Sequence, residues 1–349
     1  MNQTQKILTG AEIIWESLVQ EGVEVVFGYP GGTILPTYDA LNQYRDKVHH
    51  VLVRHEQGAT HMADGYARSS GKVGVAIGTS GPGATNMITG MATAILDSSP
   101  IVCITGQVPS NVIGSDAFQE VDIIGAAIPV TKHSYLVTDI KDLASTIREA
   151  FFVARTGRPG PVLVDIPKDI QNESTEFVYS TDPINLPGYH LPKETNESHL
   201  QEFADMVNAA EKPVILAGHG VLLSRACKEV MDIAEKASIP IATTLLGIGG
   251  VPESHPLVLG MMGMHGESWV NHAIQDADLL IACGMRFDDR VTGTLKTYSP
   301  NSKKIHIDID ASEINKNVLV DLAVHADLGT VLRKVYPRIE LSKKVDWLQ

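Results

Sequence analysis

The sequence predicts an α/β protein made of two doubly wound parallel-sheet domains. Apolar, β-branched runs alternate with segments of helical periodicity through both halves of the 349 residues, which is the pattern of parallel sheets covered by helices. The alternation stops between 172 and 198, where Pro, Asn, Ser and Glu accumulate. We therefore expect a first domain at 1–171, a linker at 172–198 and a second domain at 199–349.

The first domain begins with a helix that has both a start and a stop signal. Thr9 and Glu12 fit a capping box, and Gly22 suits the helix end. The elements expected after it are strands at 24–29, 48–55, 73–79, 100–106 and 161–167, and helices at 56–70, about 84–96 and about 140–156. The second domain is expected to contain helices at about 199–209 and 224–237, and strands at 213–218, 240–245, 277–284 and 303–310.

Composition limits the classes of partner. A formal net charge of −13 opposes any extended surface for nucleic acid or anionic membranes. Cys103, Cys227 and Cys283 are far apart, and at least two of them lie in apolar runs, which is typical of buried thiols in a cytoplasmic protein. No basic stretch leads into an apolar segment at the N-terminus and no long apolar run occurs, so we expect neither signal peptide nor membrane span.

Two glycine-rich turns follow strands of the first domain. They are YPGG at 29–32 and GTSGPGATN at 78–86, and their glycines permit positive φ and close backbone approach to a ligand. Neither turn has the spacing of a dinucleotide or Walker A motif. An ordinary strand-to-helix turn is an equal alternative for the first, and the second is best described as a tight loop that lines a cleft.

Glu56 lies where an expected strand ends and an expected helix begins, within VRHEQGATHMADGYAR at 53–68. Ligand-facing residues of open α/β sheets occupy this position, but a Glu that only caps the helix is an equal alternative. His55 and His61 are six residues apart and so lie on different helix faces. The pattern of a zinc protease is therefore not met, and we predict no metal site here.

Other polar segments also lie near strand ends. GSDAFQEVDI at 114–123 contributes Phe118 and Gln119, residue types that are more often core and surface, respectively. Arg158 and Lys168 flank one strand, where positive charge suits an acidic ligand, although exposed basic residues are usually only solvated. The second domain has short motifs beside its strands, as dinucleotide sites require: LAGHGV at 216–221, TTLLG at 243–247, MMGMHG at 261–266, GMRFDDRVTG at 284–293 and HIDID at 306–310.

Together, in their residues and in their order along the chain, these motifs resemble one family, the large subunit of acetolactate (acetohydroxyacid) synthase. The resemblance covers essentially the whole chain and rests on YPGG, RHEQGA, GTSGPGATN, ITGQVP, DAFQE, GRPGPVLVDIPKD, MGMHG, RFDDRVTG and HIDID. It implies a first domain that binds the pyrimidine of thiamine diphosphate and a Rossmann-like central domain that binds FAD.

The resemblance also implies roles for individual residues. Glu56 would hydrogen-bond the aminopyrimidine of thiamine diphosphate and so activate the cofactor, which is general acid–base catalysis. Gln119 and Lys168 are the other expected catalytic residues, with Gln119 contacting substrate and Lys168 on the substrate approach. Thr33, Pro109, Ala117 and Phe118 would line that approach. The expected cofactor-binding residues are Gly32, Pro82 and Asn86 near thiamine diphosphate, and Arg158, Gly218, Gly220, Thr244, Leu245, His265, Gly284, Arg286, Asp308 and Asp327 near FAD.

The implied reaction decarboxylates pyruvate and condenses the product with pyruvate or 2-ketobutyrate, in branched-chain amino acid biosynthesis. A homodimer or homotetramer and a regulatory small subunit are the implied partners. Family members continue into a third domain whose G-D-G…N pattern binds Mg²⁺ and the diphosphate, and nothing after Leu328 resembles it. We therefore expect a truncated or split enzyme, inactive alone. The alternatives are a thiamine-dependent pyruvate oxidase-like enzyme and a non-catalytic FAD-binding or dimerising module; DAFQE and Lys168 favour the synthase.

Overall fold

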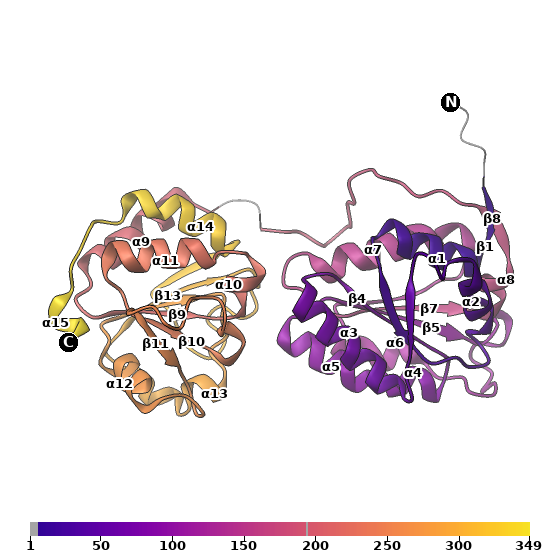
Figure 1. Ribbon diagram of the computed structural model, residues 1–349, viewed down its shortest axis with the longest axis horizontal. Coiled ribbons are helices and arrows are strands. Elements are labelled where there is room, and N and C mark those ends of the chain that lie inside the picture. Colours follow the sequence, from indigo (N-terminus) through magenta and orange to yellow (C-terminus); the bar gives the residue numbers. More distant parts are fainter. Residues whose placement is uncertain (1–5, 193–194) are drawn as a thin grey trace. The chain divides into compact units, whose positions relative to one another are not determined.

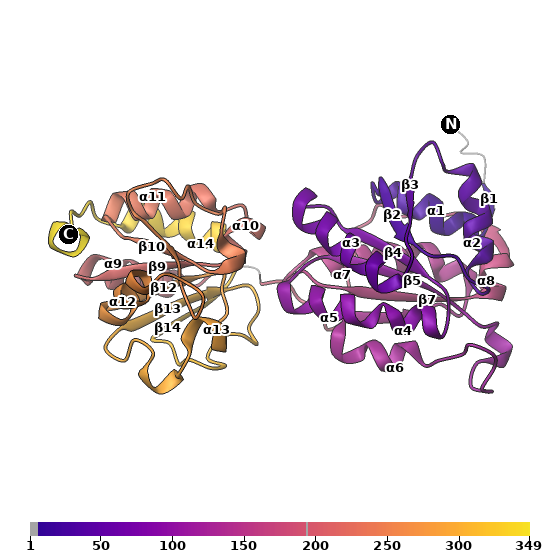
Figure 2. The same cartoon turned by 60° about the horizontal axis from the view of Figure 1, so that its bottom comes forward.

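A computed structural model describes residues 6–192 and 195–349 of the chain (Figure 1). It consists of two compact units, Met1–Tyr189 and His190–Gln349. Each unit contains one six-stranded sheet in which all neighbouring strands are parallel. Helices cover both faces of each sheet (Figure 2). The predicted fold class is confirmed.

The first sheet has the strand order β3-β2-β4-β5-β7-β6. Its central strands are almost wholly buried because both faces are covered by helices, which explains their continuous apolar sequences. The strands are β2 (Val25–Gly28), β3 (His49–Leu52), β4 (Gly74–Gly78), β5 (Ile101–Gln107), β6 (His133–Leu136) and β7 (Val162–Pro167).

Two apolar clusters hold helices against the two faces of this sheet. Trp15, Leu18 and Phe151 belong to one cluster, from helices on one face, whereas Met87 and Met91 belong to the other. The helices of the unit are α1 (Gly10–Gln20), α2 (Leu35–Ala40), α3 (Glu56–Ser70), α4 (Pro82–Asn86), α5 (Ile88–Asp97), α6 (Ile123–Ala127), α7 (Leu143–Arg155) and α8 (Lys168–Asn172). The capping box predicted for Thr9 and Glu12 is confirmed.

The second sheet has the strand order β11-β10-β9-β12-β13-β14. Its strands are β9 (Pro213–Ala217), β10 (Ile241–Thr243), β11 (Val258–Met261), β12 (Leu279–Cys283), β13 (Lys303–Asp308) and β14 (Leu322–His325). The helices of this unit are α9 (Glu197–Ala209), α10 (His219–Leu223), α11 (Cys227–Ala237), α12 (Ser268–Asp276), α13 (Asp289–Thr292), α14 (Leu328–Val335) and α15 (Val345–Leu348). Phe203 and Val331 lie in the apolar cluster on one face, and Val270 and Phe287 in that on the other.

The stretch expected to be a linker is partly ordered. Within it, β8 (Ser174–Glu176) pairs in antiparallel fashion with β1 (Ile7–Thr9), with Leu8 opposite Thr175. The division between the two units, after Tyr189, falls inside the same stretch. The expectation of a linker beginning at 172 was therefore wrong for its first residues, because an exposed two-stranded ribbon has too few apolar positions to show periodicity.

Two further differences concern the elements themselves. The single helix expected at about 84–96 is two helices, because the chain turns at Met87 between α4 and α5. Strands β6, β11 and β14 were not predicted. Each is only four residues long, lies at a sheet edge and is only partly buried, and so short a segment shows little periodicity.

Candidate active site at the strand ends of the first unit

The carboxyl ends of β2, β4, β5 and β7 meet at one edge of the first sheet, since these strands are parallel neighbours. The loops that leave this edge are the YPGG turn, the GTSGPG turn and the segment that contains Gln119. This edge is where ligands bind in open α/β sheets. The residues expected for catalysis lie in these loops and in the first turns of α3 and α8.

Glu56 is the first residue of α3, and its side chain is 7% exposed. Asn86 Nδ2, at the end of α4, donates a hydrogen bond to Glu56 Oε2 at 3.0 Å. The N-cap of α3 is instead His55, whose Nδ1 accepts a hydrogen bond from the N–H of Gln57 at 3.1 Å. The Glu56 carboxylate is therefore not occupied in capping its own helix and is turned toward α4.

The other oxygen of Glu56 accepts no hydrogen bond from the part of the chain that the structure describes. Two glycines lie beside the Glu56 side chain: a Cβ added to Gly83 would lie 3.2 Å from Oε1, and one added to Gly78 would lie 3.5 Å from Cγ. Burial and the charge of Glu56 together raise the pKa of Tyr38, whose hydroxyl lies 3.1 Å from His50 Nε2. The carboxylate thus has one fixed oxygen and one that is free to accept a proton donor.

The YPGG turn packs on the GTSGPG turn through threonines. Thr33 Oγ1 lies 2.9 Å from Thr79 Oγ1 and accepts a hydrogen bond from the N–H of Ser80 at 3.0 Å. A Cβ on Gly31 would lie 2.5 Å from the side chain of Thr79, whereas a Cβ on Gly32 would meet nothing within 4 Å. Neither glycine has positive φ. Close packing against Thr79 explains Gly31, whereas the space beside Gly32 is open.

The backbone of Gln119 packs against the GTSGPG turn. Its φ is +58°, and a Cβ on Gly81 would lie 2.6 Å from its carbonyl oxygen. The loop between β5 and α6 therefore touches the turn that starts at Gly81 and leads into Pro82. Phe118 in this loop is 87% exposed, and Ala117 and Pro109 are half-buried. The structure thus brings Glu56, Asn86, Pro82, Thr33 and Gln119 around one turn, 79–83.

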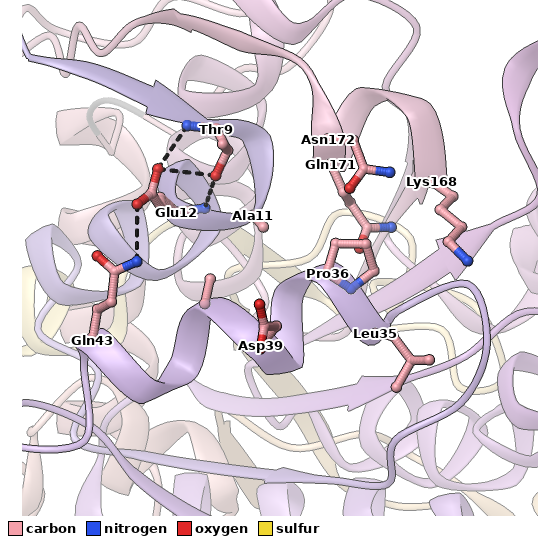
Figure 3. A pocket seen from close by; sticks show the side chains of 11 residues that line it. Thr9, Ala11, Glu12, Leu35, Pro36, Asp39, Gln43, Lys168, Gln171 and Asn172 are labelled. Carbon is pink, nitrogen blue, oxygen red and sulfur yellow. Dashed lines mark hydrogen bonds between the residues drawn. The ribbon is translucent and has the colours of Figure 1, made fainter.

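Lys168 lies at this edge beside a separate pocket of about 400 Å³. Figure 3 shows Lys168 and Asn172 on one side of this pocket, with Leu35 and Asp39 from α2 facing them. The Lys168 ammonium has no hydrogen bond or ion pair with any residue of the described ranges. The pocket is lined by Thr9, Ala11, Glu12, Leu35, Pro36, Asp39, Ala40, Gln43, Lys168, Gln171 and Asn172.

One buried acid beneath the site was not singled out from the sequence. Asp165, on β7, accepts hydrogen bonds from Thr105 Oγ1 at 2.6 Å and Gln107 Nε2 at 2.9 Å. Burial raises the pKa of Asp165 to about 6, although these two hydrogen bonds act in the opposite direction. Gln107 also donates to the carbonyl of Val121 at 3.2 Å, so the acid is linked to the end of the Gln119 loop. An aspartate in the middle of the apolar run PVLVDIP was the available signal.

In the second unit the predicted glycines lie together at the ends of two adjacent strands. The N–H of Gly220 donates to the carbonyl of Gly284 at 2.9 Å, and a Cβ on Gly218 would lie 2.4 Å from the same oxygen. Gly284 itself has φ +57°. Nearby in sequence, Arg286 is half-buried, and its guanidinium bonds to none of the residues that the structure describes.

The other residues predicted around a flavin differ in burial and in hydrogen bonding. Asp327 is the N-cap of α14 and already accepts hydrogen bonds from Ser224 Oγ at 2.6 Å and from Thr330, and Asp308 is buried and accepts from the N–H of Asp310. Thr244 caps a short 3₁₀ turn, and Leu245 and His265 are exposed. Arg158 belongs to the first unit, where its Nε donates to Ser98 Oγ at 2.9 Å. Its placement with the central-domain residues was therefore wrong.

Comparison with known proteins identifies both units. Residues 8–126 match the family described as "Thiamine pyrophosphate enzyme, N-terminal TPP binding domain", and residues 200–335 match "Thiamine pyrophosphate enzyme, central domain". This chain belongs to the thiamine pyrophosphate enzymes. The first match contains Glu56, Asn86 and Gln119, and the second contains the glycine cluster and Arg286.

This thiamine pyrophosphate enzyme has close relatives among curated proteins. It is 48% identical over 347 residues to the probable acetolactate synthase large subunit of Methanocaldococcus jannaschii, covering 98% of this chain and 58% of the relative. It is 47% identical to the acetolactate synthase isozyme 1 large subunit of Escherichia coli K12 (99% of this chain, 60% of the relative) and 49% identical to the acetolactate synthase large subunit of Corynebacterium glutamicum (96% and 53%). The chain thus spans somewhat more than half of each relative.

No described helix has the length and apolar character needed to cross a membrane. Among the same residues, no three His, Cys, Asp or Glu side chains gather as a metal site would require.

Proposed function

We propose that this chain is the thiamine- and flavin-binding part of an acetolactate synthase catalytic subunit. The observation that carries the proposal is the buried carboxylate of Glu56, fixed by Asn86 on one oxygen and free on the other, at a sheet edge lined by close glycine turns. The relatives that match nearly the whole chain are named acetolactate synthases. Such an enzyme decarboxylates pyruvate and joins the product to pyruvate or 2-ketobutyrate.

The Glu56 site fits the aminopyrimidine of thiamine diphosphate. A ring nitrogen needs one buried acceptor or proton donor, and Glu56 Oε1 offers it because no described residue occupies that atom. Gly32, whose Cβ direction is open, allows a flat ligand to approach the backbone closely. When bound, thiamine diphosphate supplies the acidic carbon and the electron acceptor for decarboxylation.

The residues of this chain then orient that cofactor and move one proton. Glu56 exchanges a proton with the aminopyrimidine nitrogen, and Asn86 keeps the carboxylate from rotating away. Gln119 faces the substrate from the neighbouring loop. Thr33, Pro109, Ala117 and Phe118 line the approach, with Pro82 beside the cofactor, and Lys168 attracts the carboxylate of the incoming 2-keto acid.

The second unit fits the phosphate and ribose groups of FAD. Gly218, Gly220 and Gly284 bring two loops into backbone contact at the strand ends, as dinucleotide sites require. The unpaired guanidinium of Arg286 suits a phosphate, because arginine binds phosphate oxygens in a bidentate manner. Asp308, Thr244, Leu245 and His265 complete the proposed site. Asp327, already bonded as a helix cap, positions the loop.

The same proposal covers the remaining partners. Mg²⁺ would bind with the diphosphate, outside the residues described above, as the family resemblance implies. The subunit would form a homodimer or homotetramer in the cytoplasm and bind a regulatory small subunit.

Acetolactate formation from pyruvate, with thiamine diphosphate, Mg²⁺ and FAD added, tests the proposal. The chain is assayed alone and after co-expression with the part of the Escherichia coli relative that its match does not cover. Acetolactate in either assay, abolished by Glu56→Gln, supports the assignment. Absence of acetolactate in both assays, with flavin bound, would instead support a non-catalytic flavin-binding module.

A further inference from the structure

The Glu120 carboxylate accepts two backbone hydrogen bonds in the middle of the loop that carries Gln119. Glu120 Oε2 accepts a hydrogen bond from the N–H of Ala117 at 2.9 Å, and Oε1 accepts one from the N–H of Gly114. These bonds, with smaller contributions from the N–H groups of Ser115 and Asp116, lower the pKa of Glu120. The carboxylate therefore lies in a concave arrangement of backbone N–H groups, which is a stable environment for an anion.

The loop needs such a partner because its backbone is unusual. Asp116 has φ +57° and Gln119 has φ +58°, although neither is glycine, and side chains with a Cβ disfavour this left-handed region. The two ends of the loop are held elsewhere, by Asp169 at the N–H of Ser110 and by Gln107 at the carbonyl of Val121. In the middle, 114–119, Ser115 bonds to the carbonyl of Val112, and Glu120 holds the N–H groups of Gly114 and Ala117 on either side of it.

The position of the segment 114–119 determines whether Gln119 contacts the turn at Gly81. The Gln119 carbonyl lies so close to Gly81 that a Cβ there would be 2.6 Å away. Gly81 is the N-cap of α4, the helix whose last residue, Asn86, holds the Glu56 carboxylate. Glu120 is thus connected, through Gln119 and α4, to the central acid of the site.

We propose that Glu120 is a positioning residue that fixes the loop 114–119 so that Gln119 lies against Gly81 beside Glu56. The inference rests on the proposed function, in which Gln119 faces the substrate. In the proposed role, Glu120 contacts neither substrate nor cofactor. It acts only by holding the backbone of its loop.

The test compares Glu120→Gln with Asp116→Asn. Glu120→Gln keeps the side-chain length but replaces one accepting oxygen by an amide that faces an N–H group. Asp116→Asn removes the same charge from the same loop, and asparagine tolerates the left-handed backbone well; the Asp116 side chain bonds to no described residue. Hydrogen–deuterium exchange of amides 81–86 and 114–119 is measured on each protein, together with kcat and KM for pyruvate and the circular dichroism spectrum.

Glu120→Gln should speed amide exchange in both segments by about tenfold or more, because charge-assisted hydrogen bonds are lost. It should lower kcat by on the order of 100-fold through misplacement of Gln119, with an unchanged spectrum, whereas Asp116→Asn should match wild type throughout. Unchanged exchange in Glu120→Gln would overturn the inference, as would faster exchange with unchanged kcat. Exchange does not depend on turnover, so a wild-type protein that forms no acetolactate would refute the proposed function while exchange still decides whether Glu120 places Gln119 against Gly81.

Discussion

Asn86 Nδ2 and Glu56 Oε2 are joined by a 3.0 Å hydrogen bond between the end of one helix and the start of another. It is the one side-chain hydrogen bond that the Glu56 carboxylate accepts within the described ranges. The bond turns a residue that could have capped its own helix into a fixed acid at the edge of the sheet.

Replacing Glu56 by Gln should slow exchange of the thiamine C2 proton in the assembled enzyme by roughly two to four orders of magnitude, the usual contribution of a general acid–base residue. Deuterium incorporation at C2, followed by NMR after acid quench, measures it. Glu24→Gln is the matched control, since Glu24 is an exposed acid paired with Lys72 at the start of β2, opposite to the site. Equal rates in Glu56→Gln and wild type would refute the assigned role.

Asn86→Ala removes the donor that fixes the Glu56 carboxylate. The C2 exchange rate should fall by about 10- to 100-fold, as expected for loss of one hydrogen bond to a charged group, and so by less than in Glu56→Gln. Asn42→Ala makes the same chemical change on an exposed residue whose side chain donates to the carbonyl of Asp39, and it should have no effect. A rate for Asn86→Ala equal to that of the control would show that Glu56 is held by other contacts.

Gly31→Ala and Gly32→Ala are neighbouring substitutions with opposite expectations. A Cβ at Gly31 would lie 2.5 Å from Thr79, so the free energy of unfolding should fall by about 1–3 kcal/mol, the usual cost of overpacking. A Cβ at Gly32 meets no protein atom within 4 Å, so its stability should be close to that of wild type, while thiamine diphosphate binds more weakly. Urea unfolding and calorimetric titration separate the two effects; a destabilised Gly32→Ala would contradict the placement of the turn.

Asp165 should make stability depend on pH. Its pKa in the folded protein is raised from 3.8 to about 6, so between these values the folded state binds more protons than the unfolded state. The free energy of unfolding contributed by this group therefore falls as pH rises from about 4 to 6, by about 3 kcal/mol at most. Asp165→Asn should remove this dependence. Urea unfolding of both proteins at several pH values measures the difference, and parallel curves would show that Asp165 keeps an ordinary pKa.

Arg286→Ala should weaken flavin retention in the purified protein by about tenfold or more, because a charged donor to a phosphate is lost. Flavin absorbance after gel filtration measures it. Lys303→Ala, an exposed cation at the amino end of β13, is the control for charge alone. The C2 exchange rate should be unchanged in Arg286→Ala; equal loss of flavin and exchange would indicate general unfolding.

The sequence predicted the interior of the fold better than its margins. Helix α3 begins and ends where it was expected, at Glu56 and Ser70. Edge strands such as β6 have polar, half-exposed residues and carry little signal. The turn at Met87 between α4 and α5 was also not predictable from the local sequence, since it depends on how the two helices pack.

For the candidate site, residue identity was more predictable than geometry. Glu56 and Asn86 were both selected, but their contact joins residues 30 positions apart and no local pattern encodes it. Asp165 was overlooked because an acid in an apolar strand looks like an interruption until its partners Thr105 and Gln107, from the neighbouring strand, are seen. The two left-handed residues of the Gln119 loop likewise depend on the carboxylate of Glu120.

The ribbon of β1 and β8 pairs the first strand of the first unit with its last strand (Figure 1). A unit whose first and last strands are paired with each other can be removed from a longer protein, inserted into another, or re-joined with new termini without disturbing its main sheet. Thr9 contributes both to this ribbon and to the first helix cap. The antiparallel pair therefore closes the unit on itself. The thiamine-binding unit can be exchanged between enzymes as a whole at this pair.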